Sequence, residues 1–248
     1  MSSNGPFGLA GAACILTGAT SAVGLACARL LVQEGAAIVL VDDDEGLLQE
    51  AAAKIGGTAV VGDPASEDTA EEAMAGVMIR TGRLDLLIHC DMLQRRLALE
   101  DTDMQEWDSI MSVNLRGAFS FGRVAMRAMS AYGKGAIVFV TPLAGTSPVL
   151  PGADVFAAST AGVHGLTRAI ARAGGPHGVR ANAVVTGYLD TPTSRRWSDV
   201  ERDAAAAATP LGRAGVPDDA ACAAVWLASA AASFVTGAVL RVDGGLAA

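Results

Sequence analysis

The sequence predicts an α/β fold, a three-layer, doubly wound parallel sheet of about seven strands with helices on both faces. Short apolar runs bounded by turn residues alternate along the chain with longer helical patterns. The runs are apolar almost throughout rather than at every second position, which is typical of strands covered on both faces. The expected strands are residues 12–16, 37–41, 58–61, 84–89, 136–140, 179–184 and 238–242.

Six segments between the strands have helical periodicity. Thr102 and Gln105 have the spacing of a capping box, so we expect a helix to begin at Thr102. Residues 187–215 carry Pro192, Pro210 and mixed charges, and we expect an irregular, mobile lid over a site there. The expected helices are residues 23–34, 46–55, 66–81, 102–132, 153–173 and 218–230.

Composition and length describe the rest of the molecule in outline. The 248 residues suit one domain, 1–248, and 51% hydrophobic with only 4% aromatic residues predicts a closely packed core of small side chains. Eighteen Lys and Arg against 26 Asp and Glu give a net charge of −8, which argues against nucleic-acid and anionic-membrane partners.

Nothing in the sequence predicts a secretory signal or a membrane span. No Lys or Arg precedes Arg29, and the longest apolar region, 220–235, is too short to cross a bilayer, so we expect a soluble, cytoplasmic protein. The four cysteines are far apart, without a CxxC pair or clustered histidines, so we expect no metal site and interpret them as small buried hydrophobic residues.

A glycine-rich turn follows the first expected strand and leads into a helix. Backbone N–H groups and the helix dipole at such a turn can hold a pyrophosphate. Asp42 closes the second strand eighteen residues after Gly24, where a carboxylate would accept hydrogen bonds from ribose hydroxyls. Because Asp43 and Asp44 follow and no Lys or Arg lies nearby, we expect NAD (NADH) rather than NADP. The turn residues expected to contact the cofactor are Gly18, Thr20, Ser21, Val23 and Gly24.

These motifs resemble those of the short-chain dehydrogenase/reductase family in its form of about 250 residues, over essentially the whole chain. The turn 17–24 reads TGATSAVG against the family's TGxxxGxG, and NAV at 182–184, PLGR at 210–213, FVTG at 234–237 and VDGG at 242–245 also match. The resemblance implies a Rossmann-like sheet, a nicotinamide cofactor and usually a homotetramer. It also implies cofactor contacts from Asp63, Gly187 and Thr191.

The resemblance breaks at the catalytic residues. Family enzymes use a Ser, Tyr, Lys and Asn together, in which Tyr transfers a proton and Lys lowers the pKa of Tyr. Here Pro142, Phe156 and Thr160 stand at the Ser, Tyr and Lys positions, and only Asn114 remains. A positioned general acid contributes about 10²–10⁴-fold to a rate, and Phe has no proton to donate. Ordinary hydride transfer by the family mechanism is therefore not expected.

Further departures lie near the same cleft. Ala22 replaces the middle glycine of the turn, and its methyl group would weaken or abolish cofactor binding. Where the family has NNAG, this chain has His89-Cys90-Asp91-Met92. His89 and Asp91 face the same side of a strand, so they either form a replacement acid–base pair or only substitute for structural contacts. Thr141 and Tyr188 are the other candidate replacements.

Three functions remain open from the sequence. The first is a diverged dinucleotide-binding protein that has lost the standard alcohol or carbonyl hydride transfer and serves as a cofactor-binding or structural subunit. It would be a homo-oligomer, dimer or tetramer, or a hetero-oligomer with an active homologue. The second is an enzyme with altered chemistry on a small-molecule ligand, either a non-redox cyclase, isomerase or dehydratase or a reductase with another proton donor. The third is an ordinary NAD-dependent oxidoreductase.

Overall fold

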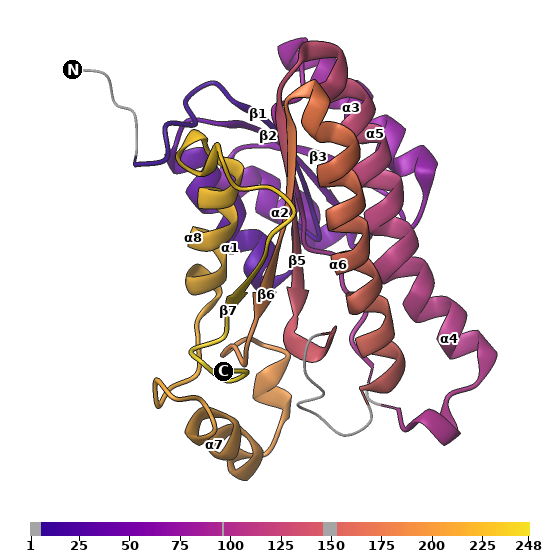
Figure 1. Ribbon diagram of the computed structural model, residues 1–248, viewed down its shortest axis with the longest axis vertical. Coiled ribbons are helices and arrows are strands. Elements are labelled where there is room, and N and C mark those ends of the chain that lie inside the picture. The colour runs from indigo at the N-terminus through magenta and orange to yellow at the C-terminus, as the bar shows by residue number, and fades with distance from the viewer. Residues whose placement is uncertain (1–5, 96, 146–152) are drawn as a thin grey trace.

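The computed structural model describes residues 6–95, 97–145 and 153–248, which form a seven-stranded parallel sheet (Figure 1). The strand order β3-β2-β1-β4-β5-β6-β7 reverses direction between β1 and β4, where doubly wound folds bind ligands. The predicted fold class is confirmed. The strands are β1 (Ala13–Thr17), β2 (Ala37–Asp42), β3 (Thr58–Val61), β4 (Leu86–His89), β5 (Gly135–Pro142), β6 (Val179–Thr186) and β7 (Val239–Val242).

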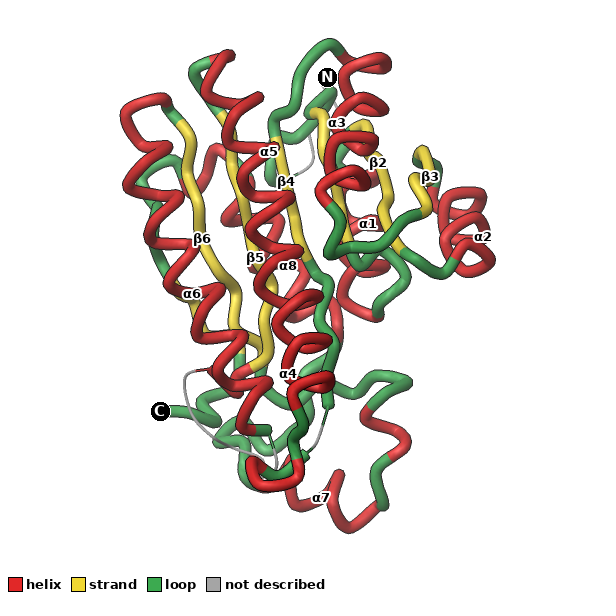
Figure 2. Tube along the Cα trace, turned by 90° about the vertical axis from the view of Figure 1, so that its right-hand side faces the viewer, coloured by secondary structure: helices red, strands yellow, loops and turns green. Residues whose placement is uncertain are grey.

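Helices cover both faces of the sheet and bury a hydrophobic cluster on each side. One face carries α1 (Ala22–Gln33), α2 (Glu45–Ile55) and α8 (Pro217–Ala228), and the other carries α3 (Glu67–Thr81), α5 (Gly117–Tyr132) and α6 (Asp154–Gly174) (Figure 2). Helix α8 buries mainly alanines against the sheet and α1, which agrees with the small-residue core. Three cysteines are buried as expected, but Cys222 is exposed because it lies on the outward side of α8.

The prediction of a capping box at Thr102 and Gln105 is wrong. Helix α4 (Met104–Met111) begins two residues later than predicted, because Asp103 is its N-cap and accepts a hydrogen bond from the Glu106 N–H at 2.8 Å. The Thr102 hydroxyl instead donates to the carbonyl of Ala98. The expected single helix 102–132 is divided into α4, a π-helical turn over Ser112–Arg116 and α5.

The segment 187–215 is more regular than expected. It holds a 3₁₀ turn and the helix α7 (Asp199–Ala207), which begins with a capping box between Ser198 and Glu201. The Ser-x-x-Glu spacing was visible in the sequence. In Figure 1, α7 lies beyond the carboxyl ends of β5 and β6, at the end of the molecule where α4 also lies.

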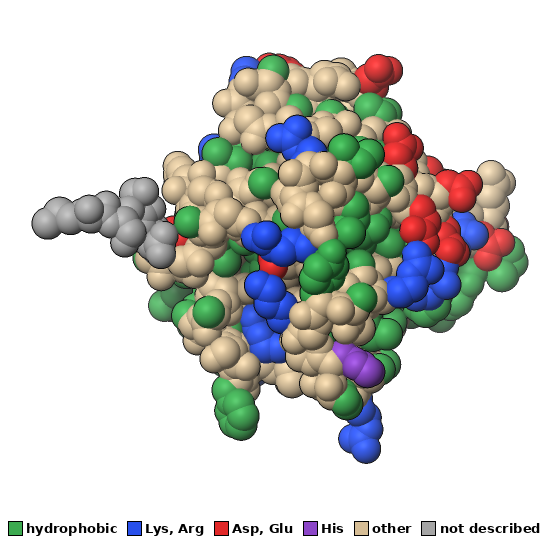
Figure 3. Space-filling view, turned by 90° about the horizontal axis from the view of Figure 1, so that it is seen from above, with side chains coloured by type: hydrophobic (Ala, Val, Ile, Leu, Met, Phe, Trp, Pro, Cys, Tyr) green, Lys and Arg blue, Asp and Glu red, His purple; other side chains and the backbone are tan. Residues whose placement is uncertain are grey.

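The opposite end of the molecule has a mixed surface. Figure 3 shows Lys and Arg side chains standing among uncharged ones there, while Asp and Glu side chains gather toward one side. Among the helices that the structure describes, none has the length and apolar character needed to cross a membrane.

Candidate dinucleotide and catalytic site

The glycine-rich turn is pressed against the end of β4. Gly18 has φ +60°, and a Cβ atom on it would lie 2.6 Å from the carbonyl carbon of Cys90. A Cβ atom on Gly24, in the first turn of α1, would lie 2.1 Å from the carbonyl oxygen of Gly18. Side chains are therefore excluded at both positions by backbone atoms.

The same turn presents free donors to an anion. Ser21 caps α1, since its hydroxyl accepts from the Gly24 N–H at 3.0 Å and donates to the Gly18 carbonyl at 2.7 Å. Within the described residues, the N–H groups of Ala22 and Val23 have no acceptor. Unpaired N–H groups at a helix N-terminus fit a phosphate group. The turn can therefore hold a dinucleotide's diphosphate even with Ala22 in place of glycine.

Three consecutive acids, Asp42 to Asp44, begin at the last residue of β2, and each has a different role. One carboxylate oxygen of Asp42 accepts from both the N–H and the hydroxyl of Thr20, each at 2.9 Å, so Asp42 also fixes the turn. Asp44 caps α2 by accepting from the Leu47 N–H at 2.9 Å. Burial, and next the charge of Asp42, raise the pKa of Asp43. Asp42 and Asp43 therefore place negative charge beside the turn, whereas the Asp44 carboxylate belongs to the helix cap.

The other expected cofactor contacts lie at the same edge of the sheet. Asp63, two residues after β3, is exposed and accepts from the Ala65 N–H at 2.8 Å. Gly187 follows β6, and a Cβ atom there would lie 2.7 Å from the Cα of Asp243. The Thr191 hydroxyl accepts from the Ser194 N–H at 3.2 Å.

The positions of Phe156 and Thr160 hold no proton-transfer group. The Phe156 side chain is buried in the first turns of α6. One helical turn later, the Thr160 hydroxyl donates to the backbone carbonyls of Phe156 and Ala157 at 3.2 and 3.0 Å. The Thr160 hydroxyl therefore already uses its proton in hydrogen bonds within α6. Pro142, at the end of β5, has no hydroxyl to orient a substrate.

Asn114 is buried in the π-helical turn and uses its whole amide group within the protein. Its oxygen accepts from the Leu93 N–H at 2.7 Å, and its nitrogen donates to the Leu93 carbonyl at 3.2 Å and to the Ser159 hydroxyl at 2.9 Å. The side chain thus fixes the segment after β4 to α6. Ser159 was not singled out in the sequence, because no motif marks it.

His89 is fully buried at the end of β4, with the rings of Phe121 and Phe139 each 5.9 Å away. Its Nδ1 lies 2.7 Å from the hydroxyl of Thr17, which is its register partner on β1. Burial lowers the pKa of His89 to about 3, so the imidazole is neutral at physiological pH. His89 is therefore not a source of protons, and Thr17 is the partner that sequence reasoning missed.

Asp91 is brought close to His89, as the sequence predicted, but without a hydrogen bond. The distance from its Oδ2 to Nδ1 of His89 is 3.6 Å, and no described group is hydrogen-bonded to that oxygen. Burial raises the pKa of Asp91 to about 7, and the charges of Asp42 and Asp43 add to this, while a hydrogen bond from Thr17 opposes it. Asp91 thus exchanges a proton near neutral pH.

Thr141 and Tyr188 are engaged elsewhere. The Thr141 hydroxyl is buried and lies 2.8 Å from Nε2 of His164 on α6. The ring of Tyr188 stacks on Trp197, with centroids 5.3 Å apart and an angle of 17° between the planes. The structure therefore does not bring these two side chains together with Asp91.

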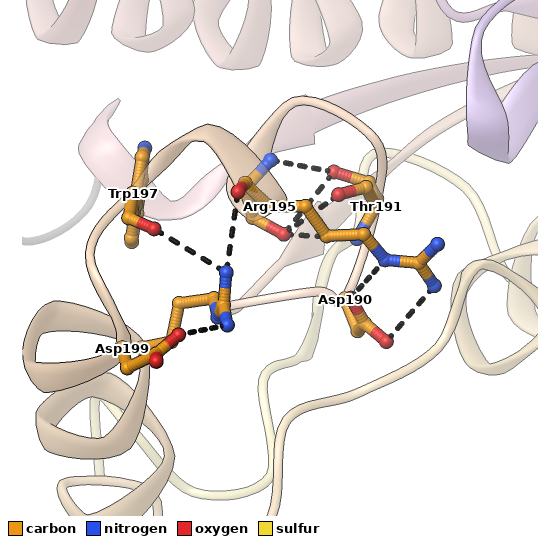
Figure 4. A network of polar contacts seen from close by, with 7 residues as sticks. Asp190, Thr191, Arg195, Trp197 and Asp199 are labelled. Carbon is orange, nitrogen blue, oxygen red and sulfur yellow. Dashed lines mark hydrogen bonds and ion pairs between the residues drawn. The ribbon is translucent and has the colours of Figure 1, made fainter.

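An ion-pair network holds the segment around Trp197 (Figure 4). The guanidinium of Arg195 makes two hydrogen bonds to Asp190, at 3.0 and 3.2 Å. Arg202 donates to the carbonyls of Arg195 and Trp197 and pairs with Asp199. Within the described ranges, no group of three or more His, Cys, Asp or Glu side chains is arranged to hold a metal ion.

Comparisons with known proteins decide the family. Residues 18–247 match a family described as enoyl-(acyl carrier protein) reductase. The chain belongs to the short-chain dehydrogenase/reductase family. It is 33% identical to the 3-oxoacyl-[acyl-carrier-protein] reductase FabG of Thermotoga maritima, over 96% of this chain and 98% of that protein. It is 38% identical to cis-4-hydroxycyclohexanecarboxylate dehydrogenase of Sinomonas cyclohexanicum, over 94% and 96%.

A solved structure of this family agrees with the fold. The crystal structure of gox2181 superimposes with a TM-score of 0.92 at 33% identity, covering 96% of each chain. Galactitol 2-dehydrogenase of Cereibacter sphaeroides is 37% identical over 96% of each chain. The residues named above as departures from the family pattern therefore stand within an otherwise complete short-chain dehydrogenase/reductase fold.

The turn of this family member should not tolerate a methyl group at its last glycine. We expect Gly24→Ala to lower the free energy of unfolding by about 2 kcal/mol or more, because the new Cβ would displace the Gly18 carbonyl. Urea denaturation of the purified variant measures this. The matched control is Gly76→Ala inside α3, where the nearest atoms would be 3.9 Å away and stability should be unchanged or slightly higher. Equal stability of the two variants would contradict the prediction.

Proposed function

We propose that this short-chain dehydrogenase/reductase binds NAD(H) at its glycine-rich turn and lacks the usual proton relay, so that it acts as a cofactor-binding or structural subunit. The observation that carries the proposal is the pair of Phe156 and Thr160. The buried ring has no proton, and the hydroxyl one turn later is bonded to carbonyls of its own helix. The standard reaction needs both an acid and a cation at these two positions.

Retained cofactor binding is supported by the turn itself. The N–H groups of Ala22 and Val23 lie in the first turn of a capped helix, and no acceptor in the described chain satisfies them. A bound nicotinamide would supply hydride chemistry, and this chain's residues would bind and orient it. Relatives named as dehydrogenases and reductases support the cofactor class.

The choice of NAD over NADP rests on charge. A 2′-phosphate on the adenosine ribose would approach Asp42 and Asp43, neither of which makes an ion pair with a described Lys or Arg. We expect NADH to bind at least tenfold more tightly than NADPH in titrations that follow nicotinamide fluorescence. Equal or tighter binding of NADPH would overturn the NAD assignment. Failure of both nucleotides to bind would overturn the cofactor proposal.

Association with further subunits belongs to the same proposal. Exposed apolar side chains lie near and on α4 and α5, where Leu99, Met104 and Phe119 are each at least half exposed. Such side chains favour burial against another chain. The partner is a second copy in a dimer or tetramer, or an active homologue that supplies the missing catalytic groups in its own cleft.

One observation favours a second candidate, an enzyme with altered chemistry. The pKa of Asp91, raised by burial to about 7, leaves much of this carboxyl protonated at neutral pH, as a replacement proton donor requires. Turnover of a ketone by the native chain that disappears in Asp91→Asn would select this candidate over the first. Turnover that survives the substitution would select an ordinary oxidoreductase.

A further inference from the structure

A buried carboxyl group stands directly behind the dinucleotide turn. The backbone of Asp91 packs on Gly18 so closely that a Cβ atom on the glycine would lie 2.7 Å from the Asp91 nitrogen. The Asp91 side chain is 8% exposed, and its Oδ2 has no hydrogen-bond partner among the described residues. An unpaired buried oxygen costs free energy, so Asp91 does not stabilise the fold through its Oδ2.

Among the described residues, no cation contributes to the pKa of Asp91. Asp42 and Asp43 at the end of β2 are carboxylates, Thr17 of β1 is neutral, and burial keeps His89 of β4 unprotonated. The nearest described cation along the chain, Arg95, lies 3.7 Å from Glu106 of α4. Within the described part of the chain, the negative charges that act on Asp91 are therefore not offset by a cation.

The remaining neighbours are neutral as well. The rings of Phe121 from α5 and Phe139 from β5 flank the adjoining His89, and the amide of Asn114 in the π-helical turn binds Leu93, two residues beyond Asp91. The thiol of Cys90 has a pKa raised well above its usual value by its contact with Cys27 and by burial. Neither Cys90 nor His89 changes its charge near neutral pH, which leaves Asp91 as the titrating group.

We propose that Asp91 is protonated in the dinucleotide complex, so that the diphosphate of the ligand and one proton bind together. This inference rests on the proposed function, because it concerns the same turn. The diphosphate carries two negative charges to the N–H groups of Ala22 and Val23, on the turn against which Asp91 packs. Protonation removes the repulsion between the ligand and this carboxyl and also gives it a hydroxyl that can donate a hydrogen bond.

The coupling between protonation of Asp91 and binding of the dinucleotide determines how the affinity changes with pH. The pKa of Asp91 is about 7 in the free protein, and a bound anion raises the pKa further. At pH values below the pKa of the free protein, Asp91 is protonated with and without the bound dinucleotide, so the affinity does not depend on this group. Between the two values binding takes up one proton, so affinity falls by up to tenfold for each pH unit.

The test is the dissociation constant of NADH between pH 5.5 and 9 at constant ionic strength, followed by nicotinamide fluorescence. For the native chain we expect a constant value below about pH 6.5 and a rise approaching tenfold per pH unit above pH 7. Asp91→Asn copies the protonated group, and we expect a flat profile with at least tenfold tighter binding at pH 8.5. Asp108→Asn, at an exposed position on α4, is the matched control and should follow the native profile.

Calorimetry of the native chain provides a second measurement that needs no variant. Titration with ADP-ribose at pH 8, in buffers with different ionisation enthalpies, should show uptake of about one proton per diphosphate bound. A flat native profile without proton uptake, or an Asp91→Asn variant that keeps the native slope, overturns this inference while NADH binding itself stands. If neither NADH nor ADP-ribose binds at any pH, the proposed function fails and the inference fails with it.

Discussion

The combined variant Phe156→Tyr, Thr160→Lys and Pro142→Ser should reduce simple ketones with NADH about 10²-fold or more faster than the native chain. Tyr at 156 supplies a proton donor, and Lys at 160, one helical turn later, supplies the positive charge that lowers the pKa of that phenol. Ser at 142 supplies the hydroxyl that Pro142 lacks. Initial rates of NADH oxidation at saturating ketone measure the gain.

Single substitutions are the controls for this result. Phe156→Tyr alone leaves a phenol without a neighbouring cation, and Thr160→Lys alone leaves a cation without an acid, so each should gain much less than the combined variant. Thermal unfolding of every variant separates a failure to fold from a failure to catalyse. Native activity that equals the activity of the combined variant would show that this cleft already has another proton donor, and the proposed loss of the relay would be wrong.

The sheet was predictable from the sequence because its strands are buried on both faces and therefore read as continuous apolar runs. The seven runs correspond to the seven strands, with end positions shifted by a few residues. The start of α4 was not predictable in the same way. Thr102 and Asp103 both suit an N-cap, and the local hydrogen bond from the Thr102 hydroxyl to the Ala98 carbonyl leaves Asp103 as the cap.

The site was predictable in its location but not in its bonding. Sequence order places Asp42 at the carboxyl end of β2, and His89 and Asp91 at and just after that of β4, and in the structure these two strands flank β1. Whether two such side chains form a hydrogen bond depends on a few tenths of an ångström, and the hydroxyl of Thr17 takes Nδ1 of His89 while Asp91 lies 3.6 Å away. The hydrogen bond of Asn114 was equally unpredictable from the sequence, because the hydroxyl that accepts it belongs to Ser159, 45 residues later in α6.

Asp91→Asn should also raise the free energy of unfolding, by about 4 kcal/mol at pH 8. The pKa of Asp91 rises from 3.8 to about 7 on folding, and each pKa unit corresponds to about 1.4 kcal/mol. Below pH 3.8 the carboxyl is protonated in both states and costs nothing. Between pH 4 and 7 the unfolded chain releases the proton while the folded chain keeps it, so native stability falls as pH rises, and above pH 7 the loss is complete.

Urea denaturation of both proteins from pH 4.5 to 8.5 measures this difference directly. Carboxylates that are not coupled to Asp91 titrate equally in the two proteins, so subtracting the two stabilities isolates Asp91 together with its coupling to Asp42 and Asp43, and the gap should widen from pH 4.5 to 7 and then remain constant. Asp108→Asn, at an exposed site, should show no such gap. Asn keeps an oxygen that can accept from Thr17, so a constant gap at all pH values would indicate a packing change instead and would remove the physical basis for proton uptake at this turn.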